Sequence, residues 1–199
     1  MEHISKRVQS LSVSQTLAMA QKSRELKEQG IDVISLSLGE PDFNTPDDIK
    51  EAAKKAIDDN FSFYPPVPGY TDLRQAISVK FREENGLDYS PEQIIVSAGG
   101  KHTLMNIIVS VVDPGEEVIL LAPYWVSYLD QVIFAEGVPV IISTTIDSDF
   151  KVTPEQLEAA ITPRTRLLIF NSPSNPTGMV YTRDEMAALV KVLENHPQV

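Results

Sequence analysis

The sequence contains no cysteine. This absence excludes disulfide frameworks, thiolate metal sites and cysteine nucleophiles, and it favours a reducing compartment. Basic residues are also few, since 17 Lys and Arg stand against 28 Asp and Glu and give a formal net charge of -11. A nucleic acid or an acidic membrane surface requires clustered positive charge, so we expect neither as a partner. A small anionic ligand needs only local positive potential and stays compatible with this charge.

Long apolar runs are missing as well. The apolar segments, such as residues 107–109 and 140–142, are far too short to cross a bilayer. The first 14 residues lack the apolar core of a signal peptide, so we expect a cytoplasmic protein. The three histidines have no metal-ligand spacing, and no metal is expected. A G-x-S-x-G nucleophile elbow is also absent from the sequence.

The composition is typical of a globular domain, and the sequence predicts alternating strands and helices. The chain has 199 residues, of which 42% are hydrophobic, and this is enough for one sizeable core. Short apolar strands are predicted at residues 32–38, 94–96, 118–121, 138–142 and 166–170. Amphipathic helices are predicted at residues 14–29, 103–112 and 126–134. Four more are predicted to begin after a threonine that acts as the N-terminal cap, at Thr45, Thr71, Thr153 and Thr182. This alternation predicts an α/β fold with a mostly parallel sheet and helices on both faces.

In an open parallel sheet, ligands bind outside the carboxyl ends of the strands. One predicted loop at that edge is Gly99-Gly100-Lys101, between a strand and a helix. Two glycines let the backbone approach an anion closely, and the helix N-terminus and the lysine add positive potential. These features suit a phosphate, although a lone Gly-Gly pair is also compatible with a simple tight turn.

Two further loops at the same predicted edge carry an aromatic ring and an amide. Trp125, the only tryptophan, follows a predicted strand and could form a platform for a planar ring, with core packing as the alternative. Asn175 lies in a proline-rich loop after the last strand, where its amide could hold a ligand oxygen without charge. The alternative is a turn in which asparagine caps its own backbone. Together the three loops indicate a site for a phosphorylated aromatic cofactor.

Six motifs, taken together, are highly specific. They are S-L-G-E-P-D-F at 37–43, Y-P-P-V-P-G at 64–69, G-G-K at 99–101, D-P-G-E-E-V at 113–118, P-Y-W at 123–125 and N-S-P-S-N-P-T-G at 171–178. With them the chain, from about residue 5 to its last residue, resembles the N-terminal half of fold-type I pyridoxal-phosphate aminotransferases. The resemblance is closest to the bacterial aspartate aminotransferases of the class I family, and it implies the large domain of that fold, incomplete at the C-terminus.

The resemblance implies a binding site for pyridoxal 5′-phosphate. The segment of Gly99, Gly100 and Lys101 would hold the phosphate of this cofactor. Trp125 would stack on the pyridine ring, and Asn175 would donate a hydrogen bond to the phenolic oxygen. Both of these side chains would also lie close to the substrate.

Two more residues gain a role from the resemblance. Gly39 would meet the amino-acid substrate through its backbone. Tyr64 would reach the cofactor phosphate of a partner subunit, so a homodimer is implied. In family members the peptide bond before the proline that matches Pro176 is often cis.

The family's Schiff-base lysine, the aspartate that pairs with the pyridine nitrogen and the arginines that bind phosphate and substrate carboxylate lie beyond Val199. We therefore expect the full-length protein to transfer an amino group between an amino acid, with aspartate as the first choice, and a 2-oxo acid. The chain alone contains no catalytic residue of the family and is expected to be inactive. By the same resemblance, residues 1–45 form the N-terminal arm and part of a small domain, and residues 46–199 form an incomplete cofactor-binding large domain.

Three alternatives stay open at this point. Another pyridoxal-phosphate enzyme of the same fold, such as a β-lyase, would share these motifs. A regulatory protein could use an aminotransferase-like domain to bind a ligand without catalysis. A fragment of this kind could also simply dimerise or aggregate, because an unfinished sheet exposes an edge strand.

Overall fold

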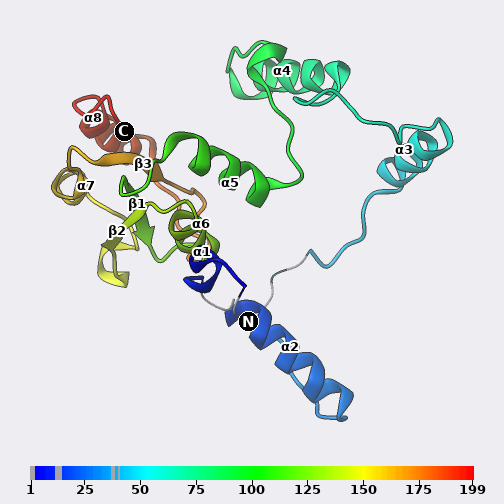
Figure 1. The fold of residues 1–199 in the computed structure, drawn as a ribbon, viewed down its shortest axis with the longest axis horizontal. Coiled ribbons are helices and arrows are strands. Elements are labelled where there is room, and N and C mark those ends of the chain that lie inside the picture. The colour runs from blue at the N-terminus through cyan, green and yellow to red at the C-terminus, as the bar shows by residue number, and fades with distance from the viewer. Residues whose placement is uncertain (1–2, 12–14, 37–38, 40) are drawn as a thin grey trace. The chain divides into compact units, whose positions relative to one another are not determined.

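The computed structural model describes residues 3–11, 15–36, 39 and 41–199 (Figure 1). The chain separates into two compact units. The first, called here the sheet unit, comprises Met1–Val13 and Lys101–Val199. The second, called here the helical unit, is Ser14–Gly100. The boundary between residues 45 and 46 that the resemblance implies lies inside the helical unit and stays a prediction.

The sheet unit is built on three parallel strands. They are β1 (Glu117–Ala122), β2 (Val138–Ser143) and β3 (Thr165–Ile169), in the order β2-β1-β3. In the central strand, Ile119 pairs with Val140 on one side and with Leu168 on the other. The strands predicted at 118–121, 138–142 and 166–170 are therefore confirmed. Their short apolar sequences suit strands that are covered on both faces.

Helices cover both faces of this sheet. They are α5 (Gly100–Val111), α6 (Ser127–Phe134), α7 (Pro154–Ala160) and α8 (Arg183–Leu193). The sheet unit also contains the short α1 (Lys6–Gln9), which contacts α6, and η2 (Ile146–Ser148). Leu120 of β1 belongs to a core cluster with α5 and α6, and Ile119 belongs to a cluster with α7 and α8. Successive strand residues point to opposite faces, so one helix pair lies on each face. The predicted fold class is confirmed.

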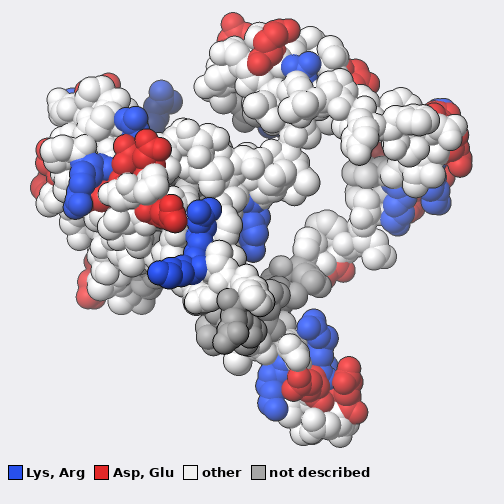
Figure 2. All heavy atoms as spheres, viewed as in Figure 1, with Lys and Arg blue, Asp and Glu red and all other residues white. Residues whose placement is uncertain are grey.

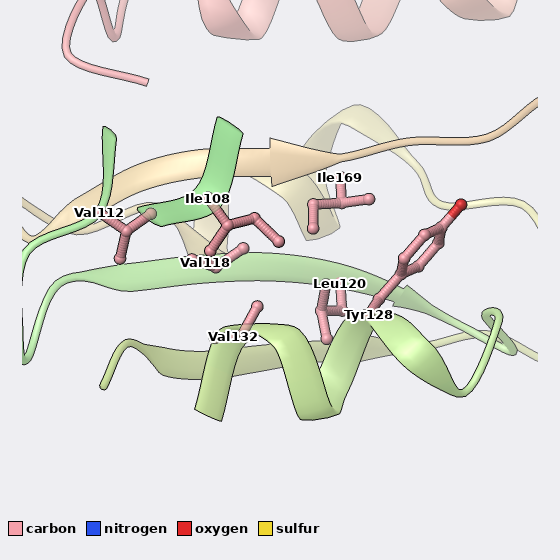
Figure 3. Close-up of a cluster of buried hydrophobic side chains, with 7 residues drawn as sticks. All are labelled: Ile108, Val112, Val118, Leu120, Tyr128, Val132 and Ile169. Carbon is pink, nitrogen blue, oxygen red and sulfur yellow. The ribbon is translucent and has the colours of Figure 1, made fainter. Parts of the chain in front are cut away.

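The first core cluster extends along the strands to their carboxyl ends. Its buried members are Ile108, Val112, Val118, Leu120, Tyr128, Val132 and Ile169. Figure 3 shows Tyr128 at the end of this cluster toward which the strand arrows point. This position makes Tyr128 the link between the hydrophobic core and the loops that follow β1 and β3.

A buried carboxylate fixes the opposite end of the sheet. Glu117, at the start of β1, is only 3% exposed. It accepts hydrogen bonds from Thr162 Oγ1 at 2.5 Å, Arg164 at 2.6 Å and Thr165 Oγ1 at 3.2 Å. The Thr162 hydroxyl lowers the pKa of Glu117, and the Arg164 charge adds to this effect against the cost of burial. The carboxylate thus joins β1 to β3 and to the turn that precedes it.

The helical unit contains α2 (Gln15–Glu28), α3 (Asp47–Asp58), α4 (Thr71–Asn85) and the single turn η1 (Pro91–Gln93). Charges of both signs lie side by side on α2 and α3, as Figure 2 shows. On α3 they form pairs three and four residues apart, such as Lys54 with Glu51 and Lys55 with Asp59. Gly86 ends α4 in the left-handed conformation, with φ +67°.

Two predicted strands are wrong. Residues 32–36 form no strand, while 37 and 38 lie outside the described residues, and residues 94–96 form none either. The alternation at Ile34 and Leu36 suggested a half-buried strand, but their exposed fractions are 85% and 91%. A strand requires a neighbour for its ladder of hydrogen bonds, and alternation alone cannot supply that neighbour.

The predicted helices are largely confirmed, but two of the caps are not. The N-cap of α3 is Pro46 without a side-chain hydrogen bond, so the predicted Thr45 cap is wrong. Thr71 is the first residue of α4 and not its cap. Thr153 and Thr182 do form the predicted capping boxes of α7 and α8. None of the helices in the described ranges is long and apolar enough to cross a membrane.

Candidate functional site at the carboxyl edge of the sheet

The candidate site lies where β1 and β3 end. These strands are parallel neighbours, so the loops that follow them leave from the same edge of the sheet. A cavity at this edge joins the two loops. Its lining consists of Leu121, Pro123, Tyr124, Tyr128, Phe150, Ile169, Phe170, Asn171, Ser174, Asn175 and Tyr181. The location agrees with the rule for ligand sites in open parallel sheets.

The loop after β3 is held by its own hydrogen bonds. The backbone N–H of Asn175 donates to Oδ1 of Asn171 at 3.0 Å, and that of Gly178 donates to the Ser174 carbonyl at 2.8 Å. The peptide bond between Asn175 and Pro176 is cis, which confirms the prediction for this position. Asn175 is exposed, so its side-chain amide is accessible to a ligand while its backbone is constrained.

Tyr181 closes the far wall of this cavity. Its hydroxyl accepts the backbone N–H of Val152 at 2.7 Å, and its ring packs edge-on against Phe170 at 5.1 Å. Its own backbone N–H donates to Ser172 Oγ at 3.3 Å. Burial raises the pKa of Tyr181, so the hydroxyl stays protonated through the neutral range. The return end of the loop is thereby attached to the segment before α7.

Two more tyrosines form the wall on the β1 side. Burial raises the pKa of both Tyr124 and Tyr128, and the charge of Asp130 adds to the shift at Tyr124. Both phenols are therefore neutral hydrogen-bonding groups beside the cavity. The wall on this side is aromatic and uncharged.

Trp125 lies next to this wall and contacts Lys101. The Lys101 ammonium is 4.8 Å from the centre of the indole ring, within the range of a cation–π contact. The indole packs edge-on against Tyr128 with ring centres 5.6 Å apart. Trp125 is only partly buried, so one part of the ring packs on the core and another part stays accessible. Both predicted interpretations, core packing and an accessible aromatic surface, thus apply to the same side chain.

The loop predicted at Gly99-Gly100-Lys101 requires a correction. No strand precedes it, and Gly100 and Lys101 already lie in the first turn of α5. Gly99 has a φ of +89°, which favours glycine. A Cβ added at Gly99 or Gly100 would meet no heavy atom within 4 Å in the described part of the chain, so the backbone here is open. The helix N-terminus predicted for an anion is present, although the strand before it is not.

Gly39 and Tyr64 belong to the helical unit. Both are exposed, and the Tyr64 side chain is fully accessible to solvent. The cavity at the edge of the sheet is formed by residues of the sheet unit. The substrate and partner roles implied for Gly39 and Tyr64 stay predictions.

Four residues at the site had no role in the sequence analysis: Tyr124, Tyr128, Asn171 and Tyr181. Tyr124 precedes Trp125 directly, and Asn171 is the second amide of the same proline-rich loop as Asn175. Both could have been found by their place in the motifs. Tyr128 lies within α6, and Tyr181 lies in the loop before α8. Only the tertiary structure brings them to the cavity. Within the described residues, no group of three His, Asp or Glu side chains could hold a metal ion.

Comparison with known proteins decides the family. Residues 31–199 match the family model described as aminotransferase class I and II. The chain belongs to this aminotransferase family. An aspartate/prephenate aminotransferase of Cereibacter sphaeroides is 58% identical over 186 residues, covering 94% of this chain and 46% of that protein. Its counterpart in Nitrosomonas europaea is 50% identical over 196 residues, covering 98% of this chain and 49% of that protein.

Solved structures of aminotransferases match as well. An aspartate aminotransferase from Rhizobium meliloti has a TM-score of 0.94 at 44% identity, covering 99% of this chain and 49% of that one. An aspartate aminotransferase from Thermus thermophilus with maleate has a TM-score of 0.94 at 46% identity, covering 98% of this chain and 51% of that one. The chain spans about half the length of the curated relatives that it matches.

Proposed function

We propose that this chain forms the N-terminal half of an aminotransferase that uses pyridoxal 5′-phosphate. In the full-length enzyme, meaning the complete polypeptide that contains this chain, an amino group would pass between an amino acid and a 2-oxo acid. When bound, the cofactor supplies the electron sink that this reaction requires. The remaining task of residues 1–199 is to bind the cofactor, orient its ring and help to hold the substrate.

The residues at the edge of the sheet fit such a cofactor. The N-terminus of α5 offers the positive end of a helix dipole to a phosphate, and the exposed Lys101 adds a positive charge. Trp125 and the tyrosine wall offer aromatic surface to a planar ring. Asn175 offers an uncharged amide to a phenolic oxygen. Anion, ring and ring oxygen thus each have a matching group.

One observation carries the proposal. The cavity between the loops after β1 and β3 contains both Tyr124 and Asn175, while Lys101 of α5 lies over the ring of Trp125. Residues from three separate segments are therefore gathered at the edge where parallel sheets bind ligands. The family membership of the chain makes pyridoxal 5′-phosphate the ligand to test first.

The experiment compares cofactor binding by variants of the full-length enzyme. Replacement of Trp125 or Lys101 by alanine should raise the dissociation constant of pyridoxal 5′-phosphate by about 5- to 30-fold, because each removes one contact worth about 1–2 kcal/mol. Lys54→Ala, an exposed position on α3, serves as the control and should leave binding unchanged. Binding is followed by the absorbance of the bound cofactor, and the melting temperature is measured in parallel. If Trp125→Ala lowers only the melting temperature, the indole is a core residue and its proposed role fails.

The proposed amino donor is aspartate, and the acceptor is a 2-oxo acid. The names of the relatives from Cereibacter sphaeroides and Nitrosomonas europaea include prephenate, so this 2-oxo acid belongs among the acceptors tested. Transaminase activity is expected of the full-length enzyme and not of residues 1–199 alone, since the sequence resemblance assigns the lysine of the reaction to a later segment. Product analysis with aspartate and prephenate tests the substrates, and it separates transamination from a β-lyase reaction.

We also propose a homodimer in the cytoplasm. The fully exposed Tyr64 is available to reach a partner subunit, and Gly39 is available to meet the substrate through its backbone. Tyr64→Phe should weaken cofactor binding only in the dimer. Analytical ultracentrifugation combined with cofactor titration tests this, and equal affinities in monomer and dimer would remove Tyr64 from the site.

A further inference from the structure

Asn171 connects the rigid end of β3 to the amide proposed to hold the cofactor. Its side-chain oxygen Oδ1 accepts the backbone N–H of Asn175 at 3.0 Å. Both residues line the same cavity. The loop carries two asparagine amides, Asn171 and Asn175, and the contacts of Asn171 indicate its role.

The two ends of this hydrogen bond differ in rigidity. On the strand side, Ile169 is 8% exposed and pairs with Leu120 of the central strand. Phe170, directly before Asn171, packs against the ring of Tyr181. On the loop side, Asn175 is exposed and has no packing partner among the described core clusters. The position of Asn175 therefore depends on hydrogen bonds more than on packing.

The other hydrogen bonds of the loop do not involve Asn175. Ser174 N–H donates to the Met179 carbonyl at 2.9 Å, and Gly178 N–H donates to the Ser174 carbonyl at 2.8 Å. Tyr181 N–H donates to Ser172 Oγ. These bonds close the loop on itself, whereas the Asn171 side chain ties Asn175 directly to the end of the strand.

We propose that Asn171 is a positioning residue that acts through Asn175. This inference rests on the proposed function, in which the Asn175 side chain donates a hydrogen bond to the phenolic oxygen of pyridoxal 5′-phosphate. Loss of the Asn171 amide releases the Asn175 backbone, which water can then solvate because the residue is exposed. The folded state loses little, but the Asn175 amide no longer stays in one place.

The phenolic oxygen reports on this placement. A hydrogen-bond donor favours the ionised oxygen and lowers its pKa, so loss of the donor raises it. In the full-length enzyme loaded with pyridoxal 5′-phosphate, Asn175→Ala should move the absorbance titration of the cofactor upward by about 1 pH unit. Asn171→Ala should move it in the same direction by roughly half as much, with little change in melting temperature.

A double-mutant cycle separates positioning from an independent effect. In the Asn175→Ala background, Asn171→Ala should cause no further movement of the titration, because the group through which it acts is gone. Asn171→Gln, which keeps the amide but shifts it by one methylene, should behave like Asn171→Ala and replaces it if that variant folds poorly. Asn85→Ala, at the end of α4 in the helical unit, is the control and should change neither midpoint.

Hydrogen exchange provides a readout that does not depend on the reaction. Asn171→Ala should accelerate exchange of the Asn175 amide by about tenfold without affecting the strand amides of β3. The positioning role is overturned if the titration shifts of the two single variants add in the double variant. It is also overturned if Asn175→Ala shifts the titration and Asn171→Ala does not. Either result leaves the proposed function intact. If Asn175→Ala itself leaves the titration unmoved, the proposed role of Asn175 fails, and that of Asn171 fails with it.

Discussion

The sheet unit and the helical unit use similar sequence signals with different results. In the sheet unit, β1 is buried on both faces, and its apolar residues contribute to two core clusters. In the helical unit, α3 has a well-separated apolar side, yet Ile49 and Ile57 are 54% and 75% exposed. Both units have well-formed helices, but among the described residues the buried core clusters belong to the sheet unit alone.

This difference shows that helix formation and burial are separate matters. Charge pairs and left-handed glycines act within a few residues, so α3 and α4 form without a core around them. Burial needs partners that are distant in the sequence. In the sheet unit, α5 to α8 and the strands supply those partners to one another. Most of the stability measured for the chain should therefore come from the sheet unit.

The largest test of this comparison is a matched pair of truncations. Leu120→Ala, at a position with no exposed surface, should lower the free energy of unfolding by about 2–5 kcal/mol because it leaves a cavity. Ile57→Ala should change it by less than about 0.5 kcal/mol, since the side chain is already mostly in water. Denaturant unfolding measures both. Equal losses of unfolding free energy would show that the apolar side of α3 is buried, and the two units would then not differ in burial.

Glu117 gives the next largest expected effect. Glu117→Gln should destabilise the sheet unit by about 1–3 kcal/mol, because it weakens charged hydrogen bonds to Thr162, Thr165 and Arg164. Glu51→Gln, in an exposed pair with Lys54, is the matched control in the helical unit and should have almost no effect.

The ionisation of Glu117 should also make the free energy of unfolding depend on pH. The folded state lowers the pKa of Glu117 below its ordinary value of 4.5, so its contribution is complete above that value. The contribution is lost as the pH falls through the lower folded pKa. The difference in unfolding free energy between wild type and Glu117→Gln should thus be constant near neutral pH and shrink below about pH 4.5. A difference that grows in acid would contradict the assignment.

Glycines in the left-handed conformation test whether the two units also differ in backbone preference, because the effect of such a glycine is local. Gly86 ends α4 with φ +67°, and Gly115 lies before β1 with φ +85°. Alanine at either position should cost about 1–2 kcal/mol, since a Cβ is unfavourable in this conformation. Thermal unfolding of both variants tests the point. Similar losses in the two units would confirm that they differ in burial and not in backbone preference.

The smallest expected effect concerns an exposed ion pair. The Lys55 ammonium of α3 lies 2.6 Å from the carboxylate of Asp59, the residue that follows the helix, and the two side chains are 75% and 45% exposed. Lys55→Ala should change stability by less than about 0.5 kcal/mol, and salt should reduce even that. A clearly larger loss at low salt would mean that surface charge, and not only local backbone preference, stabilises the helical unit.

Much of the sheet unit could be predicted from the sequence. The strands at 118–121, 138–142 and 166–170 were found because continuous apolar runs of that length suit buried parallel strands. Of the strand predicted at 32–38, residues 32–36 form no strand, because alternation at Ile34 and Leu36 describes a strand only where a neighbouring strand exists. The strand predicted at 94–96 is wrong for the same reason, so the Gly99-Gly100-Lys101 loop does not follow a strand.

The site shows a similar division. The loops with Trp125 and Asn175 were found because each follows a strand of the same parallel sheet. The contact of Lys101 with the indole, and the placement of Tyr128 and Tyr181 around the cavity, join residues that are distant in the sequence. Such contacts depend on helix packing, which no local pattern specifies.

The sequence by itself determined most of the helices, the three strands of the sheet and the motifs that identify the aminotransferase family. These depend on interactions between residues that are close in the chain, or on the identity of single residues. Only the tertiary structure decided which apolar residues are buried and which side chains face the cavity. Burial and cavity lining require segments far apart in the sequence to pack together, and the free energy of that packing belongs to the assembled fold.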